Sequence, residues 1–330
     1  MDTAAEYAIG IDIGGTTTKF GIVNHRGDIS NVGEISSTGH EDINLFIDEL
    51  YKKMKPAIKS IGGIDLIKGI GVGAPNGNYY TGTIDYAPNL QWRGIIPIAK
   101  MITNKFVKPC TLTNDANAAA IGELMYGAAR GMRDFIMITL GTGVGSGIVA
   151  NGQLIYGHDG FAGELGHTII RPEGRLHWGT GMKGSLETYA SATGISITAK
   201  EILDERVNDK SLLRDIPHDK ITSKRVCEAA LKGDVIANEV FQITGKILGE
   251  ALANFVMFSS PEAIILFGGV IKAGNLLLDP TRASMEKNLL PIFQDKVKLL
   301  FSELKESDAA ILGASALVWE IKPEALSATK

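Results

Sequence analysis

Residues 9–23 read IGIDIGGTTTKFGIV, with a pair of glycines between two apolar segments. Apolar residues alternate up to Asp12, two glycines follow, and the alternation then resumes. The pattern predicts a β-hairpin with a tight Gly-Gly turn. Backbone N–H groups and threonine hydroxyls in such a turn can hold a phosphate, and Asp12 at the strand end could hold Mg²⁺ directly or through a water. The alternative is an ordinary hairpin that binds nothing.

A second stretch repeats the design, because residues 136–149 read IMITLGTGVGSGIV. Two such hairpins, one opening each half of the chain, indicate duplicated α/β domains that bind one nucleotide between them. The phosphate-binding signature G-x-x-x-x-G-K-[ST] is absent, and no helix is expected immediately after either turn. The repetition therefore favours phosphate binding over an ordinary hairpin.

Length, composition and charge narrow the class of protein. A chain of 330 residues has room for two domains with ample cores. The net charge of −4 leaves no basic excess for nucleic acid, and no apolar run is long enough to span a membrane. The acidic amino terminus does not resemble a signal peptide, and two unrelated cysteines, Cys110 and Cys227, suggest reduced thiols. These features predict a cytoplasmic, enzyme-like protein.

Regular elements are expected at several further places. Helices are predicted over residues 41–55, 116–128 and 234–258, with Pro56 interrupting or kinking the first. Residues 68–75 read KGIGVGAP, a buried strand whose glycines imply close approach of a ligand or a neighbouring element. An apolar helix near residues 311–319 closes the chain and could return to the first domain.

Several polar residues have both a functional and a structural interpretation. Asn89 suits a sugar hydroxyl, because an amide both donates and accepts, yet Asn is also a common turn residue. Asp115 follows a strand at the expected start of a helix, where it could be a simple N-cap or a ligand-binding carboxylate. Glu164 and His167 are three residues apart, so one helical turn would present both on one side. Gly268 and Gly269 end a buried strand, where they could contact phosphate at a helix start or serve packing alone.

Six motifs occur in a family-specific order along nearly the whole chain: I-D-I-G-G-T, T-N-D-A-N-A-A-A, L-G-T-G-V-G-S-G-I, A-G-E-L-G-H, G-S-L-E-T and I-L-F-G-G-V. In these motifs the chain resembles the ROK sugar kinases of the actin-like ATPase superfamily. The resemblance implies an α/β fold of two actin-like (ribonuclease H-like) domains with a nucleotide and sugar cleft between them. The expected first domain spans residues 1–115 and is completed by a C-terminal helix over 310–330, and the second spans 116–309.

The resemblance also implies roles for individual residues. Asp115 would be the catalytic base. Sugar hydroxyls would be held by Asn89, Asn114, Glu164, His167 and Glu187. Mg²⁺–ATP would be held by Asp12, Gly14, Gly15, Thr16, Thr17, Lys19, Gly141, Thr142, Gly143, Gly268 and Gly269, with Mg²⁺ near Asp12.

One part of the chain departs from the family pattern. The family typically carries a zinc site with the motif C-x-C-G-x-x-G-C-x-E, closed by the His of its G-H pair. Here Trp178, Thr180 and Ser185 stand where the three cysteines would be, and His167 and His177 alone cannot replace them. The sequence therefore predicts no structural zinc. Trp178 and Met182 are expected to order this loop by packing apolar surface in place of the metal.

The resulting expectation is an ATP-dependent hexose kinase of carbohydrate metabolism, a glucokinase of glycolysis. Its partners would be a sugar and ATP, with no nucleic acid and no membrane, in a cytoplasmic homodimer. The alternatives are a kinase for N-acetylmannosamine, N-acetylglucosamine, mannose, fructose or allose, and a non-catalytic sugar-responsive binding protein. Family repressors carry an amino-terminal helix-turn-helix, which is not expected here because the first strand begins within ten residues.

Overall fold

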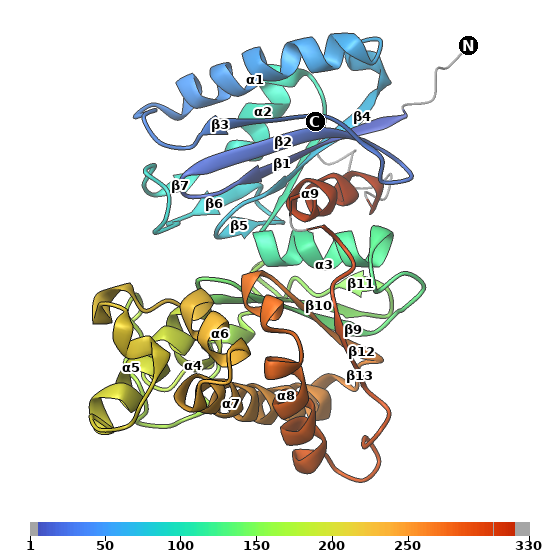
Figure 1. Cartoon of the computed structure of the whole chain (residues 1–330). Helices are drawn as coiled ribbons and strands as arrows, with labels where there is room; N and C mark the ends of the chain where they lie inside the picture. The colour runs from blue at the N-terminus through green and yellow to red at the C-terminus, as the bar shows by residue number, and fades with distance from the viewer. Residues whose placement is uncertain (1–5, 306, 321–330) are drawn as a thin grey trace. The chain divides into compact units, whose positions relative to one another are not determined.

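The computed structural model describes residues 6–305 and 307–320, and the chain forms two compact units (Figure 1). The first unit comprises residues 1–132, 153–163 and 303–330, and the second comprises residues 133–152 and 164–302. Both units are mixed α/β structures, which confirms the predicted fold class.

A five-stranded sheet forms the centre of the first unit. Its strands lie in the order β3-β2-β1-β4-β8, namely β3 (Ile29–Ser36), β2 (Thr17–Asn24), β1 (Tyr7–Ile13), β4 (Ile67–Gly73) and β8 (Cys110–Thr113). β1 and β2 are antiparallel with Ile13 opposite Thr18, and Gly14 N donates to Thr17 O at 3.1 Å across the turn. The first predicted hairpin is therefore confirmed. A small sheet follows, in the order β5 (Gly77–Asn78), β6 (Thr83–Asp85) and β7 (Ile95–Ile96), and β11 (Gln153–Leu154) also belongs to this unit.

Helices cover both faces of the five-stranded sheet. α1 (Ile43–Ser60) and α2 (Ile98–Phe106) lie on one face, whereas α9 (Ala309–Glu320) and α3 (Asp115–Tyr126) lie on the other (Figure 1). A 3₁₀ turn, η1 (Ile64–Leu66), leads into β4. α1 runs through Pro56, so of the two expected effects the interruption is wrong, while the kink stays a prediction. Pro56 is exposed, while Met54 and Ile58 on either side of it are buried and hold both halves of the helix against the sheet.

Close backbone contact places α9 on the sheet. Gly10 of β1 lies opposite Gly71 of β4. A Cβ at Gly10 would come within 2.1 Å of Ile311 O, and one at Gly71 within 1.8 Å of Ala314 O. Only glycine fits at such contacts, so Gly71 of the predicted strand over residues 68–75 serves a neighbouring helix, one of the two options expected from the sequence.

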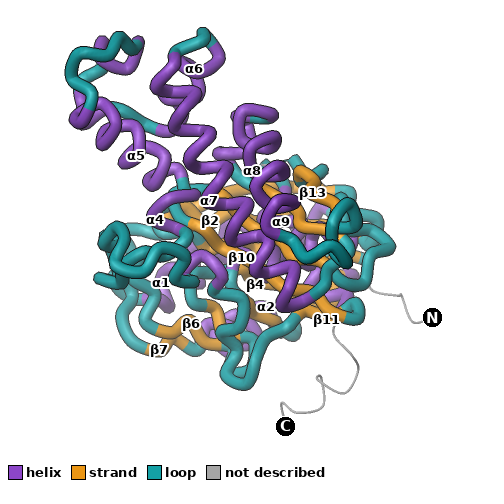
Figure 2. Tube along the Cα trace, turned by 90° about the horizontal axis from the view of Figure 1, so that it is seen from below, coloured by secondary structure: helices purple, strands orange, loops and turns teal. Residues whose placement is uncertain are grey.

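The second unit is built on the other predicted hairpin. β9 (Phe135–Leu140) and β10 (Val144–Ala150) are antiparallel with Leu140 opposite Val144, and the strands continue in the order β10-β9-β12-β13, where β12 is Ala263–Phe267 and β13 is Lys298–Phe301. The core is completed by α4 (Glu187–Ala190), α5 (Ala192–Glu205), α6 (Ser223–Leu231), α7 (Val235–Ser259) and α8 (Asn275–Asn288), which are neighbours in Figure 2. Short 3₁₀ segments are η2 (Leu165–His167), η3 (Leu212–Asp215), η4 (His218–Lys220) and η5 (Gly269–Ala273).

Asp234 fixes the start of the longest helix. Its side chain accepts a hydrogen bond from Ala237 N at 2.8 Å and so caps α7, which places this acidic residue just outside the helix expected over 234–258. Ser260 then ends α7 in the left-handed conformation with φ of 47°.

The first unit extends further along the chain than the sequence predicts, and it includes α3, which packs on α9. The boundary expected after residue 115 instead falls after residue 132, because α3 packs on α9 and belongs to the first unit. Gly313 of α9 lies so close to α3 that an added Cβ would come within 2.5 Å of Ala118 O. Residues 321–330 of the expected C-terminal helix lie outside the described residues.

Neither cysteine forms a disulfide among the described residues. Over that same part of the chain, every helix is too short or too polar to cross a membrane.

Candidate functional site

The first unit gathers two carboxylates at one edge of its sheet. β1, β4 and β8 run parallel, so their carboxyl ends meet where Asp12, Gly73 and Asp115 are found. A Cβ added to Gly73 would lie 3.8 Å from Asp12 Oδ1 and 3.7 Å from the Cα atom of Asp115. The glycine therefore lies between the two acidic residues and keeps the space beside them open.

The electrostatic environment raises the pKa of Asp12. Burial is the main cause, the nearby Asp115 carboxylate adds to it, and Lys19 opposes both, so that the pKa of Asp12 rises from 3.8 to about 6. Lys19 is the cross-strand partner of Asp12 on β2. A bound cation beside this carboxyl would stabilise its charged form and lower its pKa again.

Asp115 is free of the capping role that sequence alone could not exclude. The N-cap of α3 is Asn114, whose Oδ1 accepts from Asn117 N at 2.7 Å. The Asp115 carboxylate accepts from the neighbouring Ala116 N, at 2.8 Å, and from its own backbone N–H. Asp115 is an exposed residue, yet the protein atoms around its carboxyl desolvate the charged form and raise its pKa.

Asn89 lies next to the turn of the first hairpin. A Cβ at Gly15 would come within 2.8 Å of Asn89 O, so the loop that carries Asn89 packs directly on the Gly-Gly turn. The side chain of Asn89 is exposed, as is Thr16, whereas Gly14, Gly15, Thr17 and Lys19 are partly buried. Every candidate residue of the first unit thus comes from this hairpin, the Asn89 loop or the β8–α3 junction.

The glycine-rich turn of the second unit is open. Gly141 N donates to Gly143 O at 3.0 Å, and no atom lies within 4 Å of a Cβ added to Gly141. Gly268, with φ of 103°, packs against the backbone next to this turn, where its Cβ would come within 2.5 Å of Leu140 O. Gly269 begins the 3₁₀ segment η5, so the expected helix start at this place is not that of an α-helix.

Glu164 and His167 lie at the two ends of one short turn, as their spacing predicts. Ser146 Oγ accepts from Leu165 N at 3.1 Å and ties this turn to β10. His167 Nδ1 lies 3.2 Å from Glu164 Oε2, but the contact lacks hydrogen-bond geometry. This buried nitrogen therefore has no hydrogen-bond partner among the described residues and could serve a ligand.

Glu187 links three segments of the second unit. Its Oε2 accepts from Val144 N at 2.6 Å, and its Oε1 lies 2.6 Å from His177 Nε2. A Cβ at Gly143 would come within 2.3 Å of Glu187 Oε2, so the glycine is what allows this approach. The sequence motifs pointed to Glu187, but not to the contacts that hold it in place.

His167, His177 and Glu187 form the one candidate metal cluster found among the described residues, with one ligand atom from each lying within 4.8 Å of the others. A zinc ion bound tetrahedrally would hold its ligands about 3.3 Å apart, given metal–ligand distances of about 2.0–2.1 Å. The 2.6 Å between His177 Nε2 and Glu187 Oε1 is instead a hydrogen-bond distance. The donor set present here therefore does not fit a structural zinc ion.

Apolar packing of Trp178 and Met182 orders the loop less than expected, although the Trp178 ring stacks on His177. Trp178 is 48% exposed and Met182 is 40% exposed, so neither buries enough surface to order the loop. Hydrogen bonds hold it instead: His177 N donates to Met182 O at 2.7 Å and Gly184 N to Arg175 O at 2.8 Å. Arg175 also donates to Thr188 O at 3.0 Å, which ties the loop to the helices behind it.

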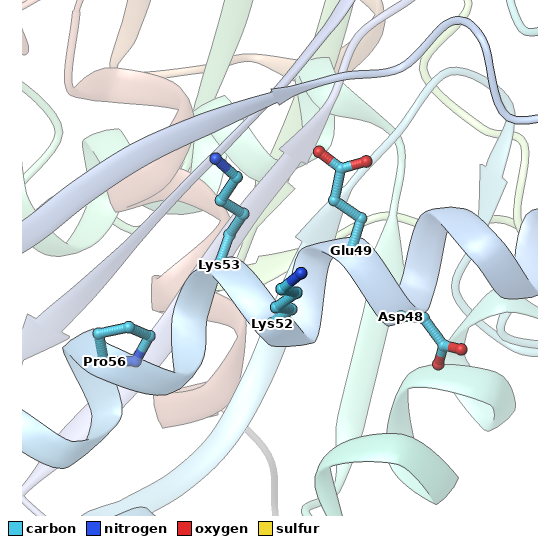
Figure 3. A pocket seen from close by; sticks show the side chains of 5 residues that line it. All are labelled: Asp48, Glu49, Lys52, Lys53 and Pro56. Carbon is cyan, nitrogen blue, oxygen red and sulfur yellow. The ribbon is translucent and has the colours of Figure 1, made fainter.

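A depression on α1 is unrelated to these residues. It is lined by Asp48, Glu49, Lys52, Lys53 and Pro56, all from one helix (Figure 3). Asp48 pairs with Lys105 at 2.5 Å and Glu49 with His40 at 2.6 Å. Both acidic side chains thus pair with other residues of the protein, and we assign no function to this depression.

Comparison with known proteins finds glucokinases and a sugar repressor that are similar to this chain over most of its length. The model of the ROK family matches residues 8–321. A glucokinase of Halalkalibacterium halodurans is 39% identical, over 94% of both chains, and a xylose repressor of Caldicellulosiruptor bescii is 30% identical, over 94% of this chain and 77% of the repressor. A ROK family glucokinase from Streptomyces griseus, solved in complex with glucose and AMPPNP, is 33% identical with a TM-score of 0.77, over 94% of this chain and 98% of that one.

The raised pKa of Asp12 predicts a pH-dependent stability. Because the folded-state pKa of about 6 exceeds the ordinary 3.8, the folded chain binds more protons in this window, and its stability falls as the pH rises through it. We expect Asp12→Asn to raise the free energy of unfolding at pH 8 by up to about 3 kcal/mol. The gain should disappear near pH 4, as measured by urea unfolding without Mg²⁺. The exposed Asp65→Asn is the control, and a gain that does not vary with pH would contradict the assignment.

Proposed function

The chain belongs to the ROK family, and we propose that it is an ATP-dependent hexose kinase that converts glucose to glucose 6-phosphate. The observation that carries the proposal is Asp115, a carboxylate with a raised pKa that is not used as a helix cap. The glucokinase of H. halodurans and the glucose- and AMPPNP-bound enzyme of S. griseus support the choice of glucose and ATP. We assign the activity to carbohydrate metabolism in the cytoplasm, in a homodimer, as the family resemblance implies.

Asp115 would act as the general base. It takes the proton of the sugar's primary hydroxyl as that oxygen attacks the γ-phosphoryl group of ATP. A pKa raised toward the working pH suits this role, because the base must be ionised and still bind a proton well. Ala116 N, which donates to Asp115 at 2.8 Å, keeps the carboxyl in one orientation.

Each unit carries candidate ligands for sugar hydroxyls. Asn114 uses its Oδ1 as the helix cap, so its Nδ2 group is the donor that remains for a hydroxyl. Asn89 supplies an exposed amide beside the first hairpin. In the second unit the sugar ligands would be Glu164, His167 and Glu187, and the unsatisfied Nδ1 of His167 supports its assignment.

The two glycine-rich turns would bind the nucleotide. Backbone N–H groups and hydroxyls of Gly14, Gly15, Thr16, Thr17, Gly141, Thr142, Gly143, Gly268 and Gly269 would contact ATP, and Lys19 adds positive charge. Mg²⁺ would bind beside Asp12. This carboxylate is partly buried and lies near that of Asp115, and Lys19 offsets the two negative charges only in part. The ion supplies charge neutralisation of the phosphates, and phosphoryl transfer otherwise depends on positioning.

A coupled assay of ADP release with a panel of sugars tests the activity. Glucose should be preferred over N-acetylmannosamine, N-acetylglucosamine, mannose, fructose and allose. Asp115→Asn should lower turnover by at least ~100-fold, the low end of general-base contributions, while glucose binding measured by calorimetry changes much less.

The same assay separates the competing functions. A preference for another sugar would assign a different kinase substrate. Glucose binding without turnover in the wild-type protein would favour a sugar-responsive binding protein, the class to which the xylose repressor relative points. Near-normal turnover of Asp115→Asn, with Asp65→Asn as the exposed control, would remove Asp115 from its proposed role.

Gly141→Val tests the second turn. The site of the new side chain is empty in the protein, so the variant should fold with wild-type stability. It should nevertheless crowd the nucleotide and raise the KM for ATP, with the smaller Gly141→Ala giving a weaker effect. An unchanged KM for ATP in a stably folded Gly141→Val protein would show that this turn is structural.

A further inference from the structure

We infer that His177 is a positioning residue, which orders the loop over residues 174–187 and orients the Glu187 carboxylate for sugar binding through hydrogen bonds in place of a metal ion. The inference rests on the proposed function only in that Glu187 is taken to contact the sugar. The hydrogen bonds themselves, and the ordering of the loop, are independent of it.

The protein backbone selects the tautomer of His177. Its Nδ1 accepts hydrogen bonds from both Gly179 N and Thr180 N, at 3.0 Å each, so it carries no proton. In a neutral imidazole the proton is then on Nε2, which faces Glu187 Oε1 at 2.6 Å and donates to it. The tautomer thus follows from the hydrogen-bond network, and His177 is only 5% exposed, which shields these bonds from water.

These contacts remove the rotational freedom of Glu187. Val144 N holds one carboxylate oxygen and His177 holds the other, so the plane of the carboxylate is fixed from two sides. Each oxygen keeps a second lone pair that can accept from a sugar hydroxyl. A ligand then meets a preorganised acceptor rather than one that must be ordered on binding.

The same imidazole closes the loop. Because Nδ1 binds the amides two and three residues further along the chain, it forms the tight turn that follows His177. The Trp178 ring stacks on His177 with ring centroids 4.5 Å apart and planes tilted by 23°, covering the imidazole although the indole itself is half-exposed. One side chain therefore links the tip of the loop to Glu187 at its base.

Two isosteric variants separate the two contacts. The Oδ1 of Asn can take the position of Nδ1, and the Nε2 of Gln the position of the ring Nε2. His177→Asn should therefore keep the turn and lose the donor to Glu187, whereas His177→Gln should keep a donor and lose the turn. His177→Leu loses both, and the exposed His218→Gln of the same unit is the matched control.

Kinetics test the effect on sugar binding. His177→Leu should raise the KM for glucose by about 10-fold or more, as expected for loss of a hydrogen bond to a carboxylate, with the KM for ATP changed less than about twofold. His177→Gln should recover part of the glucose affinity and His177→Asn should not. Calorimetric glucose binding gives the same order without turnover. Equal glucose affinity in folded His177→Leu and wild type would overturn the positioning role.

Two measurements test the bonding without any activity. Nitrogen NMR of ¹⁵N-histidine-labelled protein should show an unprotonated Nδ1 and a protonated Nε2 for His177, unchanged by a strong chelator. The Gly179 and Thr180 amides should exchange slowly in wild type and His177→Asn, and faster in His177→Gln and His177→Leu. A protonated Nδ1, or stoichiometric zinc whose removal shifts the His177 signals, would overturn the inference. If the wild type phosphorylates no sugar, the proposed function fails. The NMR, amide-exchange and calorimetry results still decide whether His177 is a positioning residue.

Discussion

The burial of Asp12 beside Asp115 is the constraint on which the candidate site of the first unit depends. Two acidic residues at the ends of neighbouring elements repel each other, and burial adds a desolvation cost, which Lys19 offsets in part at Asp12 and backbone N–H groups offset in part at Asp115. A fold keeps such an arrangement when a ligand relieves it. A divalent cation bound beside the two carboxylates would relieve their repulsion, and the backbone N–H groups of the hairpin turn would bind the phosphates that accompany it. The raised pKa of Asp12 is thereby connected to nucleotide binding.

Backbone proximity makes this arrangement possible. Gly73 leaves room between the two carboxylates, and Gly10 and Gly71 let α9 lie directly on β1 and β4. α9 in turn supports α3, the helix that begins at Asp115. The last described helix of the chain therefore stabilises the position of a residue about two hundred positions earlier, at the junction of β8 and α3.

The second unit fixes its carboxylate differently. Glu187 is held by a backbone N–H and an imidazole, and no second acidic group opposes it at those contacts. Where relatives of the family pattern would order this loop with cysteine ligands, this chain uses a turn closed by His177 and the anchoring of Arg175. The loop is thus ordered by hydrogen bonds at a place where the three cysteines of the family pattern are absent.

Local patterns predicted much of this structure. The alternation around Asp12 and in residues 136–149 predicted both hairpins, and helical periodicity predicted α7, because these signals depend only on neighbouring residues. The extent of the first unit, the unbroken α1 and the cap of α3 by Asn114 depend on tertiary packing or on side-chain geometry, which periodicity does not contain. The role of His177 was missed for the same reason, since its partner Glu187 is ten residues away across a turn.

In the proposed reaction Asp115 directs the γ-phosphoryl group of ATP to a sugar's primary hydroxyl. The most direct measurement is ¹H–³¹P correlation NMR of the product formed from glucose, ATP and Mg²⁺. We expect one phosphate ester whose phosphorus couples to the two protons on carbon 6. Coupling to the anomeric proton, or inorganic phosphate with no sugar ester, would contradict it.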